Sequence, residues 1–498
     1  MADNGGHYGG NRIDRQAMPA LSDAARAESL DALRGLSILA MALSGLVPMG
    51  PLPQWMYHAQ LIAPGMKTDL SVPGLTWVDL VFPFFLFSMG AAIPMALSRR
   101  LEQGKSWPAL LLMLARRFLL LGVFAIFVKH ISPTVIANPP GRRAWLLALL
   151  GYVLLMPALV RLPATWSIRR AVLLRSIGWI GCVGLMVWLA VRPGDSLTAL
   201  AARIVHTSDI IIVVLANAAG FGGLVWLLTR GHLAARLAVM IALIALRLGH
   251  AQPGWVRDVW NFSPIPWLYQ FYYLQYLLIV LPGSIAGDAL LRWRSVRTPE
   301  TDGSPLAGWS HRRLAALAFV MILLVVGCLI GLQSRALNAT AAGCAVLCAA
   351  GGFLVRGPRT AHESFLRSVF GWGAAWLLIG LTLEPYEGGI KKDRSTLSYY
   401  FVTSGLASLA LVSLSLAVDR FRLRRGCDLL IATGQNPLMA YAGIRSLLNP
   451  LTGLLALDAW VARYSPSPWL GVAWATLKTL ALATLVSISA RRRIVWRI

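Results

Sequence analysis

Long apolar runs dominate the sequence and leave little choice of fold. They recur along the whole chain, and each is about as long as the ~20 residues that an α-helix needs to cross the hydrocarbon core of a bilayer. Charged residues make up only 13% of the chain, whereas a soluble protein carries about a quarter. Those that are present gather in the short stretches between the runs. The chain is therefore predicted to be a polytopic membrane protein.

Fourteen segments fit this pattern, and each is expected to be a helix because a backbone in lipid must satisfy its own hydrogen bonds. The expected fold is all-α, a single transmembrane bundle of about 12–14 helices over residues 29–498. Residues 1–28 are polar and lack the apolar core of a signal peptide, so they are expected to form a mobile cytoplasmic tail. The segments lie near 33–50, 75–97, 108–129, 144–160, 172–191, 209–229, 233–249, 268–290, 314–333, 337–355, 366–384, 397–418, 428–448 and 469–490.

The net charge of +25 has the sign that nucleic-acid binding requires, but its distribution indicates something else. If the N-terminus is inside, most Lys and Arg fall in the inner loops, as the positive-inside rule demands. The charge thus predicts cytoplasmic N- and C-termini and no nucleic-acid partner. It also leaves an arginine-rich inner surface suited to an anionic cytoplasmic ligand. The five cysteines show no metal-binding spacing, and no metal is expected.

Polar residues near the N-terminal end are the strongest candidates for chemistry. Asp31 and Arg34 lie at the inner mouth of the first segment, His58 in the first outer loop, and Asp79 at the start of the second segment. An aspartate beside an imidazole fixes its tautomer and raises its basicity, as a general base requires. The alternative is that His58 is an interfacial residue bonded to a carbonyl or to lipid headgroups.

The same residues carry a family resemblance. The stretches SLDALRG at 29–35, YHA at 57–59 and LTWVDLVFPFFLF at 75–87 resemble the heparan-α-glucosaminide N-acetyltransferase family of membrane acyltransferases. Shorter matches continue to the end of the chain, at residues 273–276, 395–399, 434–438 and 493–498. Two departures, Ser44-Gly45 where relatives often have Asn and a longer stretch between His58 and Asp79, leave the identity of the acceptor open.

The resemblance implies an enzyme that moves an acetyl group from cytoplasmic acetyl-CoA, as co-substrate, to an amino sugar or glycan on the periplasmic side. His58 would be catalytic, and Asp79 would orient it. Arg34 is either a contact to the phosphates of CoA or a positive-inside anchor. Asn436, in a Gly-Gln-Asn-Pro sequence, either lines the cofactor cavity or marks a kink with a self-satisfied amide.

Two further polar features have alternatives. The outer segment with Glu387, Lys391, Lys392 and Asp393 either faces a sugar acceptor or is a solvated loop. Lys478 lies deep in the last segment and needs a carboxylate or carbonyl partner, which the sequence does not identify.

A membrane acetyltransferase is the function that these features favour. A multi-pass transporter of an amino sugar or cell-wall fragment is the alternative, because many helices with proline breaks also suit transport. The arginine-rich inner loops suit a bacterial inner membrane, and a homodimer is possible for a membrane enzyme of this size.

Overall fold

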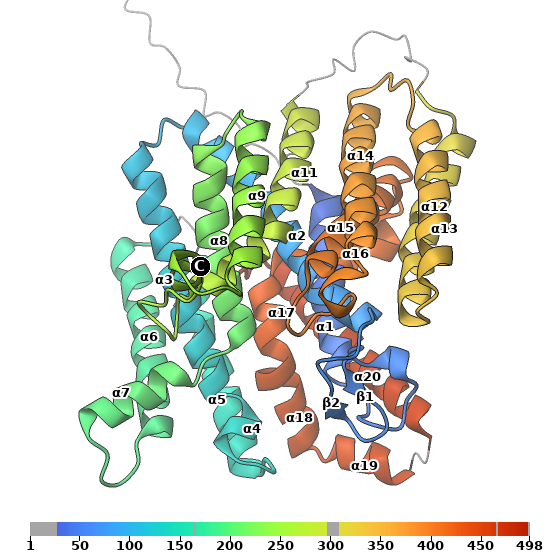
Figure 1. The fold of residues 1–498 in the computed structure, drawn as a ribbon. Helices are drawn as coiled ribbons and strands as arrows, with labels where there is room; N and C mark the ends of the chain where they lie inside the picture. The colour runs from blue at the N-terminus through green and yellow to red at the C-terminus, as the bar shows by residue number, and fades with distance from the viewer. Residues whose placement is uncertain (1–26, 163–165, 296–307, 465–466, 497–498) are drawn as a thin grey trace, which may run out of the picture.

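The computed structural model describes residues 27–162, 166–295, 308–464 and 467–496. Within these residues the fold is almost entirely helical (Figure 1), and the predicted all-α class is confirmed. The two short strands, β1 (Leu61–Ile62) and β2 (Lys67–Thr68), form an antiparallel pair with Leu61 opposite Thr68. Except for its last two residues, the predicted tail over residues 1–28 lies outside the described residues.

The α-helices are α1 (Glu28–Ser44), α2 (Trp77–Glu102), α3 (Trp107–His130), α4 (Pro133–Ile136), α5 (Arg142–Leu159), α6 (Ile168–Ala190), α7 (Leu197–His206), α8 (Ile210–Leu228), α9 (Leu233–Gly249), α10 (Trp255–Trp260), α11 (Leu277–Ser295), α12 (His311–Gln333), α13 (Leu337–Leu354), α14 (Ala361–Thr382), α15 (Leu397–Ser415), α16 (Arg424–Gln435), α17 (Pro437–Gly443), α18 (Asn449–Leu454), α19 (Leu457–Tyr464) and α20 (Pro468–Arg491). Short 3₁₀ turns are η2 (Gln54–Met56), η3 (Phe271–Tyr276) and η4 (Tyr386–Gly388), and π-helical turns are η5 (Leu416–Arg420) and η6 (Ile444–Leu448).

Each of the fourteen predicted segments overlaps a helix. In the described part of the chain, eleven helical segments are long and apolar enough to cross a membrane, which makes this a multi-pass membrane protein. Of the other three, α1 and α9 have 17 residues each. The segment predicted at 428–448 is divided at Asn436 into α16 and α17, because Pro437 at the first position of α17 has no N–H to continue α16.

Four ion pairs at the ends of helices bear on how these segments alternate. If all fourteen segments cross, each of these pairs joins two residues on the same side of the bundle. The pairs are Arg335–Glu384 and Arg247–Glu387 on the predicted outer side, and Arg294–Asp419 and Glu28–Arg424 on the predicted inner side. The pair Arg247–Glu387 therefore fits a topology in which the short helix α9 crosses like its longer neighbours.

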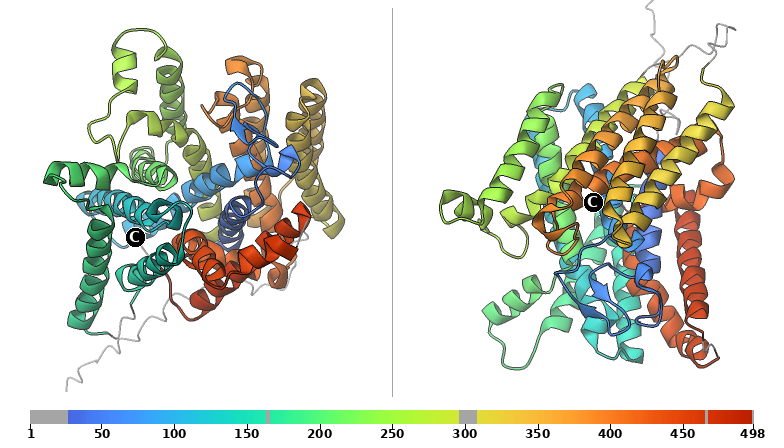
Figure 2. Two further views of the ribbon diagram at one scale, coloured as in Figure 1. Left: turned by 90° about the horizontal axis from the view of Figure 1, so that it is seen from below. Right: turned by 45° about the vertical axis from the view of Figure 1, so that its right-hand side comes forward.

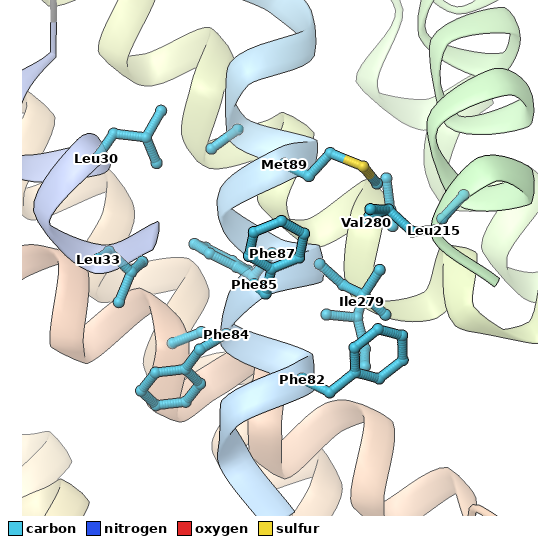
Figure 3. Packing of buried hydrophobic residues seen from close by; sticks show 14 of the residues in the cluster. Leu30, Leu33, Phe82, Phe84, Phe85, Phe87, Met89, Leu215, Ile279 and Val280 are labelled. Carbon is cyan, nitrogen blue, oxygen red and sulfur yellow. The ribbon is translucent and has the colours of Figure 1, made fainter. Parts of the chain in front are cut away.

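Helix α2 lies at the centre of the bundle and positions the candidate site. Figure 3 shows its phenylalanines packed among side chains of α1, α8 and α11. Helix α11 approaches it closely: a Cβ added at Gly90 would lie 2.1 Å from the carbonyl oxygen of Val280, and one at Gly283 would lie 2.3 Å from that of Phe87. Small residues allow such backbone contact between membrane helices. Tight packing therefore fixes α2 in place.

The periphery of the bundle is apolar and open to lipid. The α12–α13 hairpin lies at its edge (Figures 1 and 2) and contacts α14 and α15. Val346 and Phe353 on α13 are 68% and 66% exposed, which suits side chains that face acyl chains rather than water.

The partner of Lys478 comes from α19. Its Nζ donates to Asp458 Oδ1 at 2.9 Å, and Trp474 Nε1 donates to the same oxygen at 2.7 Å. Partial burial raises the pKa of the Asp458 carboxyl, but hydrogen bonds from Thr452, Trp474 and Lys478 lower it, and the net shift is downward. The carboxylate that the sequence could not identify therefore comes from the short helix just before α20.

Candidate active site

The loop between α1 and α2, the first loop on the predicted outer side, is held by hydrogen bonds from its own side chains. Tyr57 accepts a hydrogen bond from the Leu52 N–H at 3.0 Å and donates to the Pro48 carbonyl at 2.8 Å. Gln54 donates to the carbonyls of His58 and Leu61, both at 3.0 Å. These cross-links hold the backbone around His58 in one conformation.

His58 and Asp79 lie in direct contact. Nδ1 of His58 is 2.6 Å from Oδ1 of Asp79, whose side chain is 1% exposed. The other carboxylate oxygen, Oδ2, accepts hydrogen bonds from the N–H groups of Thr76 and Ala59 at 3.0 and 3.1 Å. Thr76 and Asp79 form the capping box of α2. One carboxylate therefore both caps α2 and fixes the imidazole.

This arrangement selects one tautomer of His58. An ionised carboxylate only accepts hydrogen bonds, so the short contact places the imidazole proton on Nδ1. Nε2 then carries the lone pair of the ring, and the side chain is 34% exposed. An accessible, oriented imidazole of this kind can act as a general base or as a nucleophile.

A lysine from a distant loop completes the cluster. Lys392 Nζ lies 3.2 Å from Nδ1 and 3.3 Å from Nε2 of His58. Its cation therefore sits beside the ring edge that carries both nitrogens. The sequence pointed to Lys392 only as one of several charged residues of an outer segment, because nothing local shows that residues 334 positions apart meet.

The loop that carries Lys392 is docked on the first outer loop. Gln60 Nε2 donates to the Asp393 carbonyl at 2.6 Å, and its Oε1 accepts from the Asp393 N–H at 2.7 Å. The Gly74 N–H donates to the Ile390 carbonyl at 2.8 Å. The residues of this segment therefore do not all have the same role. Glu387 pairs with Arg247 and holds the loop, whereas Lys392 lies at His58.

The two residues predicted to bind the cofactor make contacts that hold the backbone. Arg34 donates to Asp31 Oδ1 at 3.2 Å and to the carbonyls of Ser88 and Gly434, both at 3.3 Å. It therefore ties α1 to α2 and α16. A role of Arg34 at the cofactor stays a prediction.

Asn436 is fully buried where α16 breaks. Its Nδ2 donates to the Ile494 carbonyl at 3.0 Å, and its Oδ1 accepts from the Trp496 N–H at 3.1 Å. Its amide therefore holds the segment after α20 against the break. The hydrogen-bond partners of Arg34 and Asn436 given above do not include His58. Neither residue lines the cavity described next.

A cavity of about 360 Å³ lies between α2, α3, α5, α6 and α8, in the half of the bundle predicted to face the cytoplasm. Four arginines line it: Arg100, Arg116, Arg117 and Arg175. Among the described residues, none of them has an ion-pair partner, and Arg34 and Arg100 both act electrostatically on Arg117. All four arginines are exposed, and like charges this close together repel one another unless an anion lies between them, so this cavity is suited to a polyanionic ligand.

Sequence reasoning missed this arginine cavity. Its signal was present in Arg116-Arg117, two charges in the middle of an otherwise apolar segment. That these side chains share a cavity with Arg175 follows only from the packing of α6 against α3 and α5.

Comparison with known proteins gives a family but no activity. The model of a domain of unknown function (DUF5009) matches residues 26–290, slightly more than half of the chain. No curated protein matches the chain. The matched range contains His58, Asp79 and the four arginines of the cavity, and it ends before Lys392 and Asn436. The chain therefore belongs to the family described as a domain of unknown function, DUF5009.

Proposed function

We propose that this protein is a membrane-embedded acetyltransferase of a bacterial inner membrane. It moves an acetyl group from cytoplasmic acetyl-CoA to an amino sugar or glycan on the periplasmic side. The observation that carries the proposal is the 2.6 Å contact between His58 Nδ1 and Asp79 Oδ1, which leaves the basic lone pair of the ring on Nε2 at the start of α2. The two residues belong to the stretches that resemble the acetyltransferase family.

The arginine cavity supports the donor half of the proposal. Arginine makes bidentate contacts with phosphate oxygens, and CoA carries several phosphates at the end opposite its thioester. Helix α2 contributes to both places, with Asp79 at its outer start and Met89 and Arg100 on the cavity. At 1.5 Å per residue, these two lie about 15 and 31 Å from Asp79 along the helix axis. The donor must therefore extend along α2 to reach His58.

His58 has two possible roles in the transfer. As a general base, Nε2 accepts a proton from the acceptor amine while the nitrogen attacks the thioester carbonyl, and the C–S bond breaks. As a nucleophile, Nε2 itself forms an acetyl-imidazole and CoA leaves before the acceptor reacts. In both, the carboxylate of Asp79 stabilises the positive charge that develops on the ring.

Thiol release from acetyl-CoA tests the proposal over a panel of amino sugars, with the protein purified and reconstituted in vesicles. His58→Ala is expected to lower the rate by about 10²–10⁴-fold and to leave acetyl-CoA binding intact. His206→Ala is the matched control, because His206 is an exposed histidine of the same predicted side. Full activity of His58→Ala would contradict the proposal, and uptake of labelled sugar without acetyl-CoA would indicate a transporter instead.

A further inference from the structure

The amine of Lys392 occupies the position that an acceptor amine must take. In either mechanism, the attacking nitrogen has to come within hydrogen-bonding distance of His58 Nε2. Lys392 Nζ is already 3.3 Å from that atom. A primary amine of the chain itself thus stands where the amine of an amino sugar would react.

The fold holds the backbone that carries this amine. The residue after Lys392 is fixed by the reciprocal hydrogen bonds between Gln60 and Asp393. Its own carbonyl accepts a hydrogen bond from the Ser395 hydroxyl. The base of the loop is held by Glu384, whose Oε1 lies 2.6 Å from Arg335 Nη1 and 3.2 Å from the Ile390 N–H. The backbone at Lys392 therefore keeps its side chain within reach of His58.

The neighbouring lysine is placed differently. The Lys391 amine lies beside Gly388, since a Cβ built on that glycine would be 2.9 Å from Nζ. The two lysines share a loop, a charge and a predicted side of the membrane, but only Lys392 contacts His58. Proximity to the imidazole is what distinguishes them.

From this geometry we propose that Lys392 is a site of self-acetylation, used when no acceptor amine is bound. This inference rests on the proposed acetyltransferase function. His58 Nε2 takes one proton from the Lys392 ammonium, and the freed lone pair attacks the thioester carbonyl. The C–N bond forms, the C–S bond breaks, and the CoA sulfur takes the proton from the imidazolium. The second proton on the lysine nitrogen passes to water, which leaves N-acetyl-lysine and CoA.

The modification would change the site in two ways. It removes the positive charge beside His58 and Asp79, and it leaves an amide in the position of the acceptor amine. Self-acetylated protein is therefore expected to transfer acetyl groups more slowly to an external acceptor. A saturating acceptor should protect Lys392 by occupying the same place.

Peptide mass spectrometry after incubation with carbon-13-labelled acetyl-CoA tests the inference on the full-length protein in vesicles. The expected result is one labelled acetyl group on Lys392 and none on Lys391. Label should fall by about 10²-fold or more in His58→Ala, and it should fall when an amino sugar that supports thiol release is added. Lys391→Arg should keep the label, and Lys392→Arg should lose it. Acetyl-CoA binding by His58→Ala shows that this variant remains folded.

The outcomes separate this inference from the proposed function. Thiol release with an acceptor but no label on Lys392 would overturn self-acetylation and leave the acetyltransferase standing. Equal label on both lysines, or label that persists in His58→Ala, would mean uncatalysed acetylation and would also overturn it. If neither thiol release nor labelling of Lys392 is observed, both proposals are rejected.

Discussion

At the scale of single residues, Asp79 has two roles that substitutions can separate. It caps α2 together with Thr76, and it fixes the tautomer of His58. Asn in its place keeps an acceptor oxygen for the cap but cannot hold Nδ1–H of the imidazole as a carboxylate does.

Asp79→Asn is therefore expected to lower acetyl transfer by about 10²-fold or more, with only a modest loss of stability. Thr76→Ala is the matched change at the other half of the capping box and is expected to cost about 1 kcal/mol of stability with a smaller loss of rate. Thermal unfolding in detergent and steady-state rates measure both effects. If Asp79 had only a structural role, each variant would lose rate in proportion to its loss of stability, and that result would contradict the prediction.

The arginine cavity gives a second prediction at this scale. Arg117→Met removes one charged donor from the cavity and should weaken acetyl-CoA binding by about 10–100-fold, because a hydrogen bond to a charged group contributes about 1.5–3 kcal/mol. Arg99→Met is the control, since Arg99 lies in the last turn of α2, next to the cavity residue Arg100, but does not line the cavity itself. Calorimetric titration of the purified protein measures both. If both variants weaken acetyl-CoA binding equally, the binding depends on the general positive charge of this surface and not on the cavity.

The residues that could be predicted from the sequence were those close together along the chain. His58 and Asp79 are 21 positions apart, and a loop followed by a helix start brings them together. Lys392 meets His58 from a loop 334 positions away. Asp458 is only 20 positions from Lys478, but it lies on the short helix α19, which was not among the predicted segments. Such pairs depend on tertiary packing, which no local pattern encodes.

At the scale of elements, the contact of α2 with α11 sets the position of the site. Gly90→Ala should destabilise the protein by about 1–3 kcal/mol, because the new Cβ would lie 2.1 Å from the Val280 carbonyl oxygen and a backbone atom cannot rotate away. Gly343→Ala on α13 is the control, since nothing lies within 4 Å of a Cβ there. Thermal unfolding measures the difference. Equal stability of the two variants would mean that the helices do not touch as described.

The break between α16 and α17 shows what sequence can predict about an element. Pro437 correctly indicated an interrupted helix in the segment at 428–448. The role of Asn436 did not follow, because its partners are backbone groups at residues 494 and 496. A buried amide must find partners, but the chain offers no local sign of which segment supplies them.

At the scale of the whole molecule, the alternation of fourteen segments depends most on α9, which is short. If α9 crosses, Arg230→Cys before it and Gln252→Cys after it face opposite sides. Both positions are exposed, and the native cysteines are buried except for the partly exposed Cys427. An impermeant maleimide applied to intact cells should label Gln252→Cys and spare Arg230→Cys until the membrane is opened. Labelling of both from outside would contradict the fourteen-segment topology.

The fold class of the molecule was the most predictable of its properties. Runs of apolar residues set the helices, and the bias of Lys and Arg predicts their direction. Which helices surround α2, and hence where cavities form, depends on close contacts such as Gly90 against Val280. Those contacts position both the His58 site and the arginine cavity, at opposite ends of one helix.

The central claim is that an acetyl group crosses the bilayer, and vesicles with a fixed orientation test it most directly. Labelled acetyl-CoA is supplied only on the side of the arginine cavity and an amino sugar only on the side of His58. The account predicts acetylated sugar on the His58 side, CoA on the cavity side, and about 10²–10⁴-fold less of both with His58→Ala. Acetylated sugar that forms only when donor and acceptor share one side, or that forms equally with His58→Ala, would contradict it.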